Sequence, residues 1–415
     1  MARHMNRRRP TLRSGVPIWL HDQQLKQSYP RLRGARRGDV AIVGGGMTGM
    51  LAALTFAEAG VSTIVLEAGY VSSGSTVASS ALLLHEPDKG LTELTRRYGS
   101  AASRRLWQLS CDAVPDLTAT LRQHSIECEL VERDAVYYAT QKEAAAALYD
   151  EYRRRVKAGF SAEWLTPGAL RDLTAIAGHG AVLSTGNAQF NPYTACLGLA
   201  RAAASSGAQI FERSRVVRIE QLRQGVRLHT PSGTVNARSV VVATGYATPS
   251  FRPLAGRFRM YWTYVLATER LTPSRRRELG LGEVMVWDTD RPYQYCRWTA
   301  DHRLLLGGGD RRVRPGPQRN LRFSTATAEL REHFEALFPA LTNIRVERAW
   351  EGRFAKTPDS FPYIGPHRRY PRHLFALGYG GNGMTFSAIA ARMLLEHWQG
   401  KPSRDHRLFA FGRMR

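Results

Sequence analysis

Long apolar runs are missing from this chain of 415 residues. No stretch approaches the roughly 20 uncharged apolar residues that a membrane-spanning helix needs. The Arg-rich N-terminal segment is not followed by the apolar stretch of a secretory signal. The sequence therefore predicts neither a membrane span nor export.

Cysteine is scarce as well. The four residues, Cys111, Cys128, Cys196 and Cys296, are scattered and form no CxxC pair. Such spacing excludes a disulfide framework and a thiolate metal site of the usual kinds. We expect reduced thiols, a cytoplasmic location and no metal.

Acidic residues are too few to balance the basic ones. The chain has 59 Lys and Arg against 35 Asp and Glu, a formal net charge of +24, and only six of the basic residues are Lys. Residues 1–38 and 401–415 together carry thirteen of these net charges. We interpret 1–35 as a basic N-terminal extension and 401–415 as a basic tail, both solvated. A nucleic-acid partner is the less favoured explanation of the charge.

A nucleotide-binding pattern begins at Asp39, in DVAIVGGGMTGMLAALTFAEAGVSTIVLEAG. An apolar run, a glycine turn, a helix of small residues and a second apolar run follow one another. Gly44 allows the tight turn, Gly46 lets a pyrophosphate approach the backbone, and Gly49 lets the helix pack closely on the strand. The order predicts a strand–turn–helix–strand unit that binds a dinucleotide.

The rest of this unit supplies further contacts. The free amides of the helix N-terminus, which includes Met47 and Thr48, face the phosphates. Glu67, followed by Ala68, ends the second apolar run and is placed to accept hydrogen bonds from the adenosine ribose. An acid at this position disfavours the 2′-phosphate of NADP.

The chain returns to the nucleotide unit twice, which favours FAD over NAD. The first return is a hairpin that turns at 231–233 and leads into a buried strand ending in Ala243, Thr244 and Gly245. The second is HLFALGYGGNGMTFSAIAARMLLEHW, a strand, a glycine turn and a long helix. Its helix N-terminus suits the electron-rich edge of a reduced flavin.

Together these segments resemble the superfamily of FAD-dependent D-amino acid oxidases, glycine oxidases and sarcosine oxidases, over residues 36–400. The resemblance rests on VAIVGGGMTG, SSGSTVASSALL, RSRVVRI, VVATG and GYGGNGM. It implies an amine or amino-acid oxidoreductase. It also implies FAD contacts at Gly74, Ser75, Thr76, Ser79, Ser80, Val216, Gly378, Gly380, Gly381, Asn382, Gly383 and Met384.

Several family positions carry different residues here. Ala78 and Gly352 stand where relatives link flavin covalently through histidine or cysteine, so we expect non-covalent FAD. Leu84 and Thr385 stand where the sarcosine oxidase type binds a carboxylate. Leu305 lies near the position of that type's oxygen-activating lysine. Oxygen and a quinone or protein carrier therefore remain open as electron acceptors.

Substrate residues are expected in VMVWDTDRPYQYCRWTADHRLLLGGGD. Strand alternation places Tyr293, Tyr295 and Arg297 on one face, where two phenols and a guanidinium suit a carboxylate or a polar amine. Arg353 lies one position out of register with a substrate-binding arginine of glycine oxidases.

Tyr261 and Tyr264, on another expected strand of the substrate domain, are candidates for lining the same cavity, with core packing as the favoured interpretation. Core packing is also an alternative for Tyr293 and Tyr295. A surface ion pair is the alternative for Arg297.

The predicted fold class is α/β, a Rossmann-like FAD-binding domain interleaved with an α+β substrate domain on a mostly antiparallel sheet. We assign 36–98, 176–250 and 344–400 to the first domain and 99–175 and 251–343 to the second.

Three functions compete. The first is oxidation of the C–N bond of a small amine or amino acid by hydride transfer to flavin, giving an imine that hydrolyses. The second is action on a modified nucleoside in tRNA, and the third is non-catalytic FAD binding.

Overall fold

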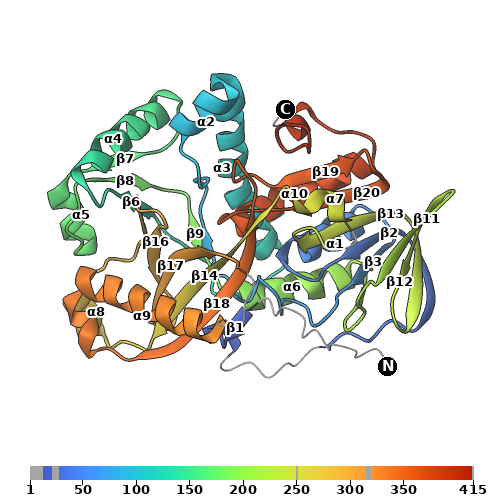
Figure 1. Ribbon diagram of the computed structural model, residues 1–415, viewed down its shortest axis with the longest axis horizontal. Helices are drawn as coiled ribbons and strands as arrows, with labels where there is room; N and C mark the ends of the chain where they lie inside the picture. Colours follow the sequence, from blue (N-terminus) through green and yellow to red (C-terminus); the bar gives the residue numbers. More distant parts are fainter. Residues whose placement is uncertain (1–12, 21–27, 249–250, 315–318, 414–415) are drawn as a thin grey trace.

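The computed structural model describes residues 13–20, 28–248, 251–314 and 319–413. Figure 1 shows two halves side by side, each built around its own large sheet. A third sheet joins three short strands: β4 (Leu82–Leu83), β9 (Ala188–Gln189) and β5 (Val131–Glu132).

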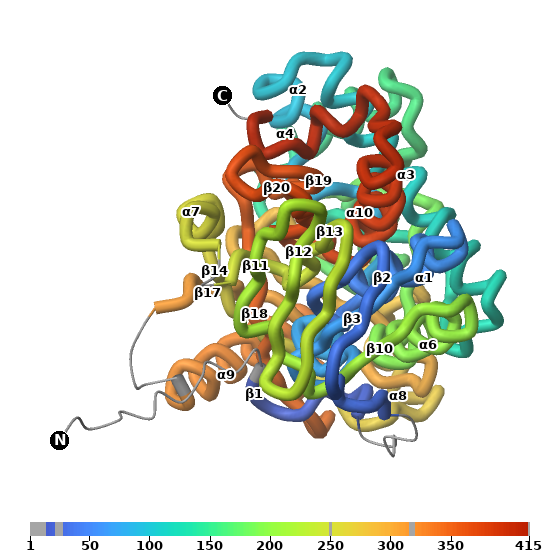
Figure 2. Tube along the Cα trace, turned by 90° about the vertical axis from the view of Figure 1, so that its right-hand side faces the viewer, coloured from blue at the N-terminus to red at the C-terminus, as the bar shows by residue number. Residues whose placement is uncertain are grey.

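The first half contains an eight-stranded sheet in the order β10-β3-β2-β13-β12-β11, with β20 on β13 and β19 on β20. Strands β10, β3, β2, β13 and β20 run parallel, so their carboxyl ends share one edge. Figure 2 shows this sheet face on. Its strands are β2 (Gly34–Val43), β3 (Thr63–Leu66), β10 (Gln209–Phe211), β11 (Arg218–Leu222), β12 (Gly225–His229), β13 (Gly233–Gly245), β19 (Tyr363–His367) and β20 (Tyr370–Leu377).

Four helices share an apolar core beside this sheet: α1 (Met47–Glu58), α3 (Ser100–Gln123), α6 (Pro192–Ser205) and α10 (Gly383–Trp398). Helix α1 buries most of its residues, which agrees with its run of small and apolar side chains. Helix α6 starts at Asn191, whose side chain accepts from the amides of Tyr193 and Thr194, and Pro192 occupies the first turn.

The second half contains a nine-stranded sheet in the order β1-β18-β14-β17-β16-β15-β6-β8-β7. All of its pairs are antiparallel except β15 with β6. The strands are β1 (Arg13–Gly15), β6 (Ala135–Tyr138), β7 (Glu163–Leu165), β8 (Ala181–Ser184), β14 (Arg259–Thr268), β15 (Met285–Asp288), β16 (Gln294–Trp298), β17 (Leu304–Arg312) and β18 (Val346–Lys356).

Helix α9 (Arg319–Leu337) packs against β14 and β17 of this sheet. The remaining short helices are α2 (Leu91–Tyr98), α4 (Lys142–Lys157), α5 (Pro167–Thr174), α7 (Arg252–Ala255), α8 (Pro273–Leu279), η1 (Ile18–Leu20), η3 (Pro339–Asn343) and η4 (Arg404–Leu408).

The architecture confirms the predicted fold class, a parallel nucleotide-binding sheet interleaved with a mostly antiparallel one. The hairpin at 231–233 is present, since β12 pairs antiparallel with β13. Sheet membership differs from the predicted segments for several strands. Strand β8 lies within the predicted segment 176–250 and β18 within 344–400, yet both belong to the nine-stranded sheet. Burial patterns do not reveal which sheet a strand joins, so the sequence could not separate them.

The basic ends were expected to be solvated, and this is only partly right: Arg31, Arg33, Arg404 and Arg407 are exposed, but other described residues of both ends are buried. Strand β1 pairs with β18, and Trp19 is buried. At the other end Phe409 and Phe411 are buried, and Arg413 forms an ion pair with Asp359 at 2.7 Å. Residues 1–12, 21–27 and 414–415 of these segments lie outside the described residues.

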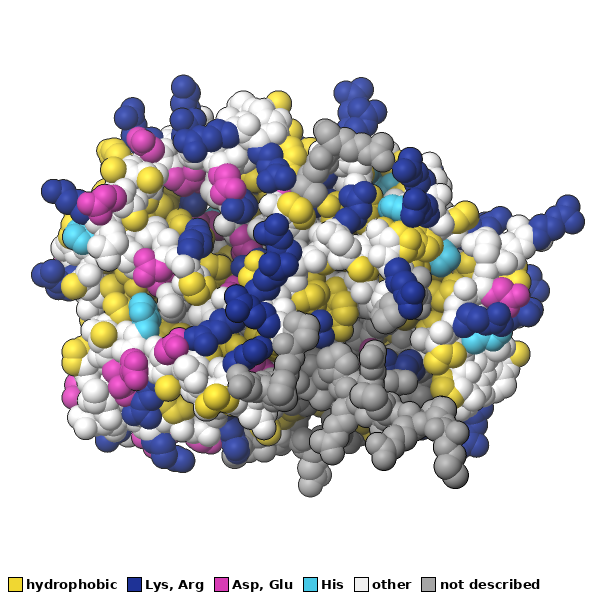
Figure 3. Space-filling model, viewed as in Figure 1, with side chains coloured by type: hydrophobic (Ala, Val, Ile, Leu, Met, Phe, Trp, Pro, Cys, Tyr) yellow, Lys and Arg dark blue, Asp and Glu magenta, His cyan; other side chains and the backbone are white. Residues whose placement is uncertain are grey.

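Charge is unevenly spread over the surface. Figure 3 shows Lys and Arg side chains on both halves of one face, whereas Asp and Glu gather mainly on the half that carries α4, α8 and α9. Within the described ranges no helix is long and apolar enough to cross a membrane.

Candidate functional site

The first glycine turn joins β2 to α1 at the shared carboxyl edge. Gly44 has φ +114°, a conformation that side chains rarely adopt, and a Cβ there would lie 2.5 Å from the Ala243 carbonyl oxygen. A Cβ on Gly49 would lie 1.9 Å from the Gly44 carbonyl oxygen. Gly46 precedes α1 and has no side chain that could cap the first helical amides, of which that of Met47 donates to Thr76 Oγ1. This turn fits a pyrophosphate group.

Glu67 follows β3 and connects two backbone turns. Its carboxylate accepts from the amides of Gly45 and Gly69, each at 2.6 Å. Burial raises the pKa of Glu67, and these amide hydrogen bonds oppose the rise. A carboxylate oxygen has two lone pairs, so the same group retains capacity to accept from ribose hydroxyls. Ala68 continues this turn, and Val216 is half-buried before β11.

Segment 74–80 lies beside the start of α1. Thr76 Oγ1 accepts from the amide of Met47 at 3.0 Å, which joins the segment to the start of α1. Three buried side chains then hold consecutive carbonyls of its end. The donors are Trp350 Nε1 to Ala78 at 2.9 Å, Trp19 Nε1 to Ser79 at 2.9 Å, and Arg297 Nε to Ser80 at 2.8 Å.

The second glycine loop, residues 378–383, leads from β20 into α10. The amide of Gly378 donates to the Gly245 carbonyl at 2.9 Å, which places the loop beside the end of β13. Asn382 Nδ2 donates to the Glu86 carbonyl at 2.6 Å. The glycine turn, segment 74–80 and this loop thus lie around the carboxyl ends of parallel strands. The arrangement suits a dinucleotide with an aromatic head group, and the residues fit FAD.

Arg297 does not lie where strand alternation suggested a substrate group. Its guanidinium is 2% exposed and donates to three backbone carbonyls, those of Ser80, Trp298 and Phe190, at 2.8–3.0 Å. Burial lowers its pKa to about 9. A guanidinium with these partners has no reach toward a ligand, so the hypothesis that Arg297 binds a substrate carboxylate is corrected to a positioning role for segment 74–80.

The two tyrosines of the same strand face are close to each other, with ring centroids 6.2 Å apart. Burial raises the pKa of Tyr295 to about 12, and the nearby Ser80 and Thr263 side chains oppose this rise. Burial also raises the pKa of Tyr293, with Asp88 as the next contribution. Both phenols therefore stay protonated at neutral pH.

A charged group beside these tyrosines was missed by sequence reasoning. Lys356 Nζ lies 2.9 Å from Asp310 Oδ2 and 5.2 to 5.6 Å from the ring centroids of Tyr261, Tyr293 and Phe354. Burial alone would lower the pKa of Lys356, but Asp310 and Asp88 outweigh burial and raise it. We call Asp88, Tyr261, Tyr293, Asp310 and Lys356 the Asp88 cluster. Alternation along β18, which puts Gly352, Phe354 and Lys356 on one face, was the signal that could have found Lys356.

The other side chains that the sequence suggested for the substrate site lie outside the Asp88 cluster. Arg353 alternates with Phe354, and its guanidinium lies 5.4 Å from the Tyr246 ring centroid. Tyr264 is in the apolar core of the larger sheet. Thr385 Oγ1 donates to the Leu84 carbonyl at 2.7 Å, so the two positions that bind carboxylate in the sarcosine oxidase type meet here as an uncharged contact.

Leu305 is completely buried, in a core cluster with Ala78 and Trp350. The two positions at which relatives attach flavin are also neighbours. A Cβ built on Gly352 would lie 2.9 Å from the Ala78 Cβ. The linkage positions expected from sequence thus come together, with no nucleophilic side chain at either one.

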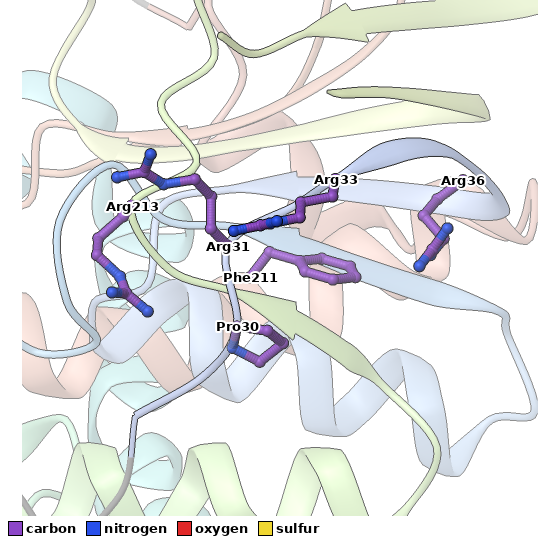
Figure 4. A pocket seen from close by; sticks show the side chains of 6 residues that line it. All are labelled: Pro30, Arg31, Arg33, Arg36, Phe211 and Arg213. Atoms are coloured by element: carbon purple, nitrogen blue, oxygen red, sulfur yellow. The ribbon is translucent and has the colours of Figure 1, made fainter. Parts of the chain in front are cut away.

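A basic pocket lies away from the second glycine loop, beside the edge strand β10. Arg31, Arg33, Arg36 and Arg213 surround Pro30 and Phe211 there (Figure 4). All four arginines are exposed. The pocket gathers part of the positive charge that the sequence concentrates near its N-terminal end.

A metal site was not expected from the sequence. Over these residues, no group of three or more His, Cys, Asp or Glu side chains could hold a metal ion. The four cysteines are all free.

Comparison with known proteins gives a consistent result. Residues 39–397 match the DAO family, described as FAD dependent oxidoreductase. The chain is 25% identical to a probable oxidoreductase OrdL of Haemophilus influenzae, over 92% of this chain and 87% of the relative. It is 28% identical to the gamma-glutamylputrescine oxidoreductase of Escherichia coli, over 88% and 84%. The crystal structure of glycine oxidase from Geobacillus kaustophilus superposes with a TM-score of 0.77 at 23% identity, over 91% of this chain and 98% of that one.

Proposed function

Because the chain belongs to the DAO family of FAD-dependent oxidoreductases, we propose that it oxidises the C–N bond of a small amine or amino acid. The observation that carries the proposal is the meeting of the glycine turn, segment 74–80 and the second glycine loop beside Tyr295 of β16 and Tyr293, which precedes that strand. Relatives named for glycine and for gamma-glutamylputrescine support a nitrogen-bearing substrate. Membership of a family of oxidoreductases argues against non-catalytic FAD binding.

Bound FAD supplies the acceptor for a hydride from the carbon next to nitrogen. Loss of that hydride and of the amine proton leaves an imine, which water converts to a carbonyl compound and a free amine. Residues of this chain hold the reacting partners. Thr76 and Arg297 hold segment 74–80, which would line the cofactor site, and Tyr293 presents a protonated phenol beside the second glycine loop.

We further propose that FAD is held non-covalently, because Ala78 and Gly352 offer no group that could form a bond to it. A cytoplasmic location and the choice between oxygen and a quinone or protein carrier stay predictions. Leu305 is buried and uncharged, so no cation stands near the position of the oxygen-activating lysine of the sarcosine oxidase type. This absence favours a slow reaction with oxygen.

The proposal is tested by mixing FAD-loaded protein anaerobically with a panel of primary amines, secondary amines and amino acids. We expect at least one of them to bleach the flavin absorbance and to yield the matching carbonyl compound. Failure of the whole panel contradicts the proposal. Admitting air afterwards distinguishes oxygen from a quinone or protein carrier as the electron acceptor, since reoxidation within milliseconds excludes a dehydrogenase.

The basic pocket supports a second candidate, action on a modified nucleoside in tRNA. Four exposed arginines suit phosphate groups, and such binding weakens steeply with salt. The test is retention of tRNA at rising salt by the wild type and by a variant with Arg31, Arg33 and Arg213 replaced by Ser. Equal retention by both proteins eliminates this candidate.

A further inference from the structure

Asp88 lies against the second glycine loop and has no role in the scheme above. Its Oδ2 accepts from the amide of Gly381 at 3.0 Å. A Cβ built on Gly381 would lie 2.7 Å from Asp88 Oδ1 and 2.6 Å from the Tyr293 hydroxyl. A carboxylate oxygen and a phenol therefore flank the same point of the loop.

Two cations, Lys356 and Arg291, lie near Asp88 and oppose the rise of its pKa, but neither forms a direct ion pair with it among the described residues. Lys356 pairs with Asp310 at 2.9 Å, and Arg291 donates to the carbonyls of Asp290 and Thr289 at 2.7 and 3.3 Å. Among the contacts of the described residues, Asp88 Oδ1 accepts no hydrogen bond. Asp310 has a direct ion pair in the cluster, and Asp88 has none among the described residues.

Burial raises the pKa of Asp88, against the opposing effects of Lys356 and then of the Gly381 amide. An ionised carboxylate in such a place is costly unless a cation comes close to it. The group whose charge it complements is a ligand ammonium rather than a ligand carboxylate.

Two of the positions at which the sarcosine oxidase type binds a substrate carboxylate hold no cation here. Leu84 and Thr385 are uncharged and contact each other. The Arg297 guanidinium is used by three carbonyls. Arg353 lies beside the Tyr246 ring, and its buried Nε has no hydrogen-bond partner among the described residues. Beside the second glycine loop, Asp88 offers a partner for positive charge, whereas Lys356 is already paired with Asp310.

We propose that Asp88 is the residue that binds the ammonium group of the substrate, through Oδ1 and with the Tyr293 ring beside it, and that it selects amines over substrates anchored by a carboxylate. The inference rests on the proposed function, because it names the substrate class of that same site. An ammonium donates to the free oxygen and lies close to an aromatic face, two interactions that an uncharged or anionic ligand loses.

Binding can be measured without turnover. tert-Butylammonium has no hydrogen on the carbon next to nitrogen, so hydride transfer from it is excluded. Calorimetry of FAD-loaded protein with tert-butylammonium, tert-butanol and pivalate compares a cation, a neutral molecule and an anion of similar shape. We expect binding of the cation only, weakened about 10- to 100-fold in Asp88→Asn. Asp172→Asn, which alters an exposed carboxylate on α5, serves as the matched control.

Kinetics give a second readout. For an amine that reduces the wild type anaerobically, Asp88→Asn should raise KM about tenfold or more while its FAD content stays unchanged. Binding of pivalate in preference to tert-butylammonium, lost in Lys356→Met, overturns the proposal and makes Lys356 a carboxylate anchor. Unchanged affinity and KM in Asp88→Asn also overturn it. Neither result touches the proposed function, which fails only if the whole amine and amino-acid panel leaves the flavin oxidised.

Discussion

Arg297 Nε donates a hydrogen bond to the Ser80 carbonyl at 2.8 Å, across 217 positions of the chain. The bond joins the centre of the nine-stranded sheet to the end of segment 74–80. Its neighbours in that segment are held by Trp350 and Trp19. The antiparallel sheet therefore determines the position of a segment that belongs to the cofactor side.

Replacing Arg297 with Met should impair cofactor binding and stability together. Three buried carbonyls lose their donor, and unpaired buried acceptors are costly, so we expect a loss of about 2–5 kcal/mol in the free energy of unfolding. Urea unfolding and FAD content after purification check this. A variant that keeps FAD and stability but selectively loses carboxylate substrates would restore the sequence-based hypothesis.

Glu67→Ala should weaken FAD binding. The substitution removes the acceptor that holds the amides of Gly45 and Gly69, along with the expected ribose contact. Titration of the apoprotein with FAD, followed by flavin fluorescence, should show a Kd raised about tenfold or more. Glu143→Ala, at an exposed position of α4, is the control and should bind like the wild type.

Gly352→Ala should crowd the cofactor side. The added methyl would approach the Ala78 Cβ at 2.9 Å, and overpacking of this kind costs about 1–3 kcal/mol. Lower FAD content and a lower melting temperature are expected. The double variant Ala78→Gly with Gly352→Ala should recover part of both, and no recovery would mean that Ala78 is not the obstacle.

Acid precipitation tests how the flavin is held. We expect a colourless pellet and all of the flavin in the supernatant, because neither Ala78 nor Gly352 carries a nucleophile. Yellow colour that stays with the polypeptide would contradict non-covalent binding.

Asp288 should make stability depend on pH. Burial raises its pKa from 3.8 to about 7, so the folded chain holds this proton more tightly than the unfolded chain. The stabilisation is complete below pH 3.8 and is lost as the pH rises through 7. Relative to Asp288→Asn, the wild type should lose on the order of 2–4 kcal/mol between pH 4 and pH 8, at about 1.4 kcal/mol per unit. Urea unfolding of both proteins at several pH values measures the difference, and parallel curves would exclude the effect.

Short-range sequence patterns were sufficient to predict the strand, turn and helix units of the eight-stranded sheet. The turn at Gly44 and Gly49 needs residues without Cβ, and the acid at 67 follows a buried strand, so the residues that form these features are adjacent or nearly adjacent in the chain. The same holds for β20, the second glycine loop and α10. Such features are set by backbone conformation and short-range periodicity, which a sequence displays directly.

The arrangement of the polar groups was decided only by the tertiary structure. Alternation put Arg297 on the face of Tyr295, but long-range pairing filled that space with the carbonyls of Ser80 and Phe190. Asp88, Asp310 and Lys356 come from a loop and two strands far apart in the chain, so alternation can place Lys356 on one face of β18 but no spacing shows that the three side chains meet. Which buried charge finds a partner depends on how the two sheets meet, and the sequence carries that information only through the whole fold.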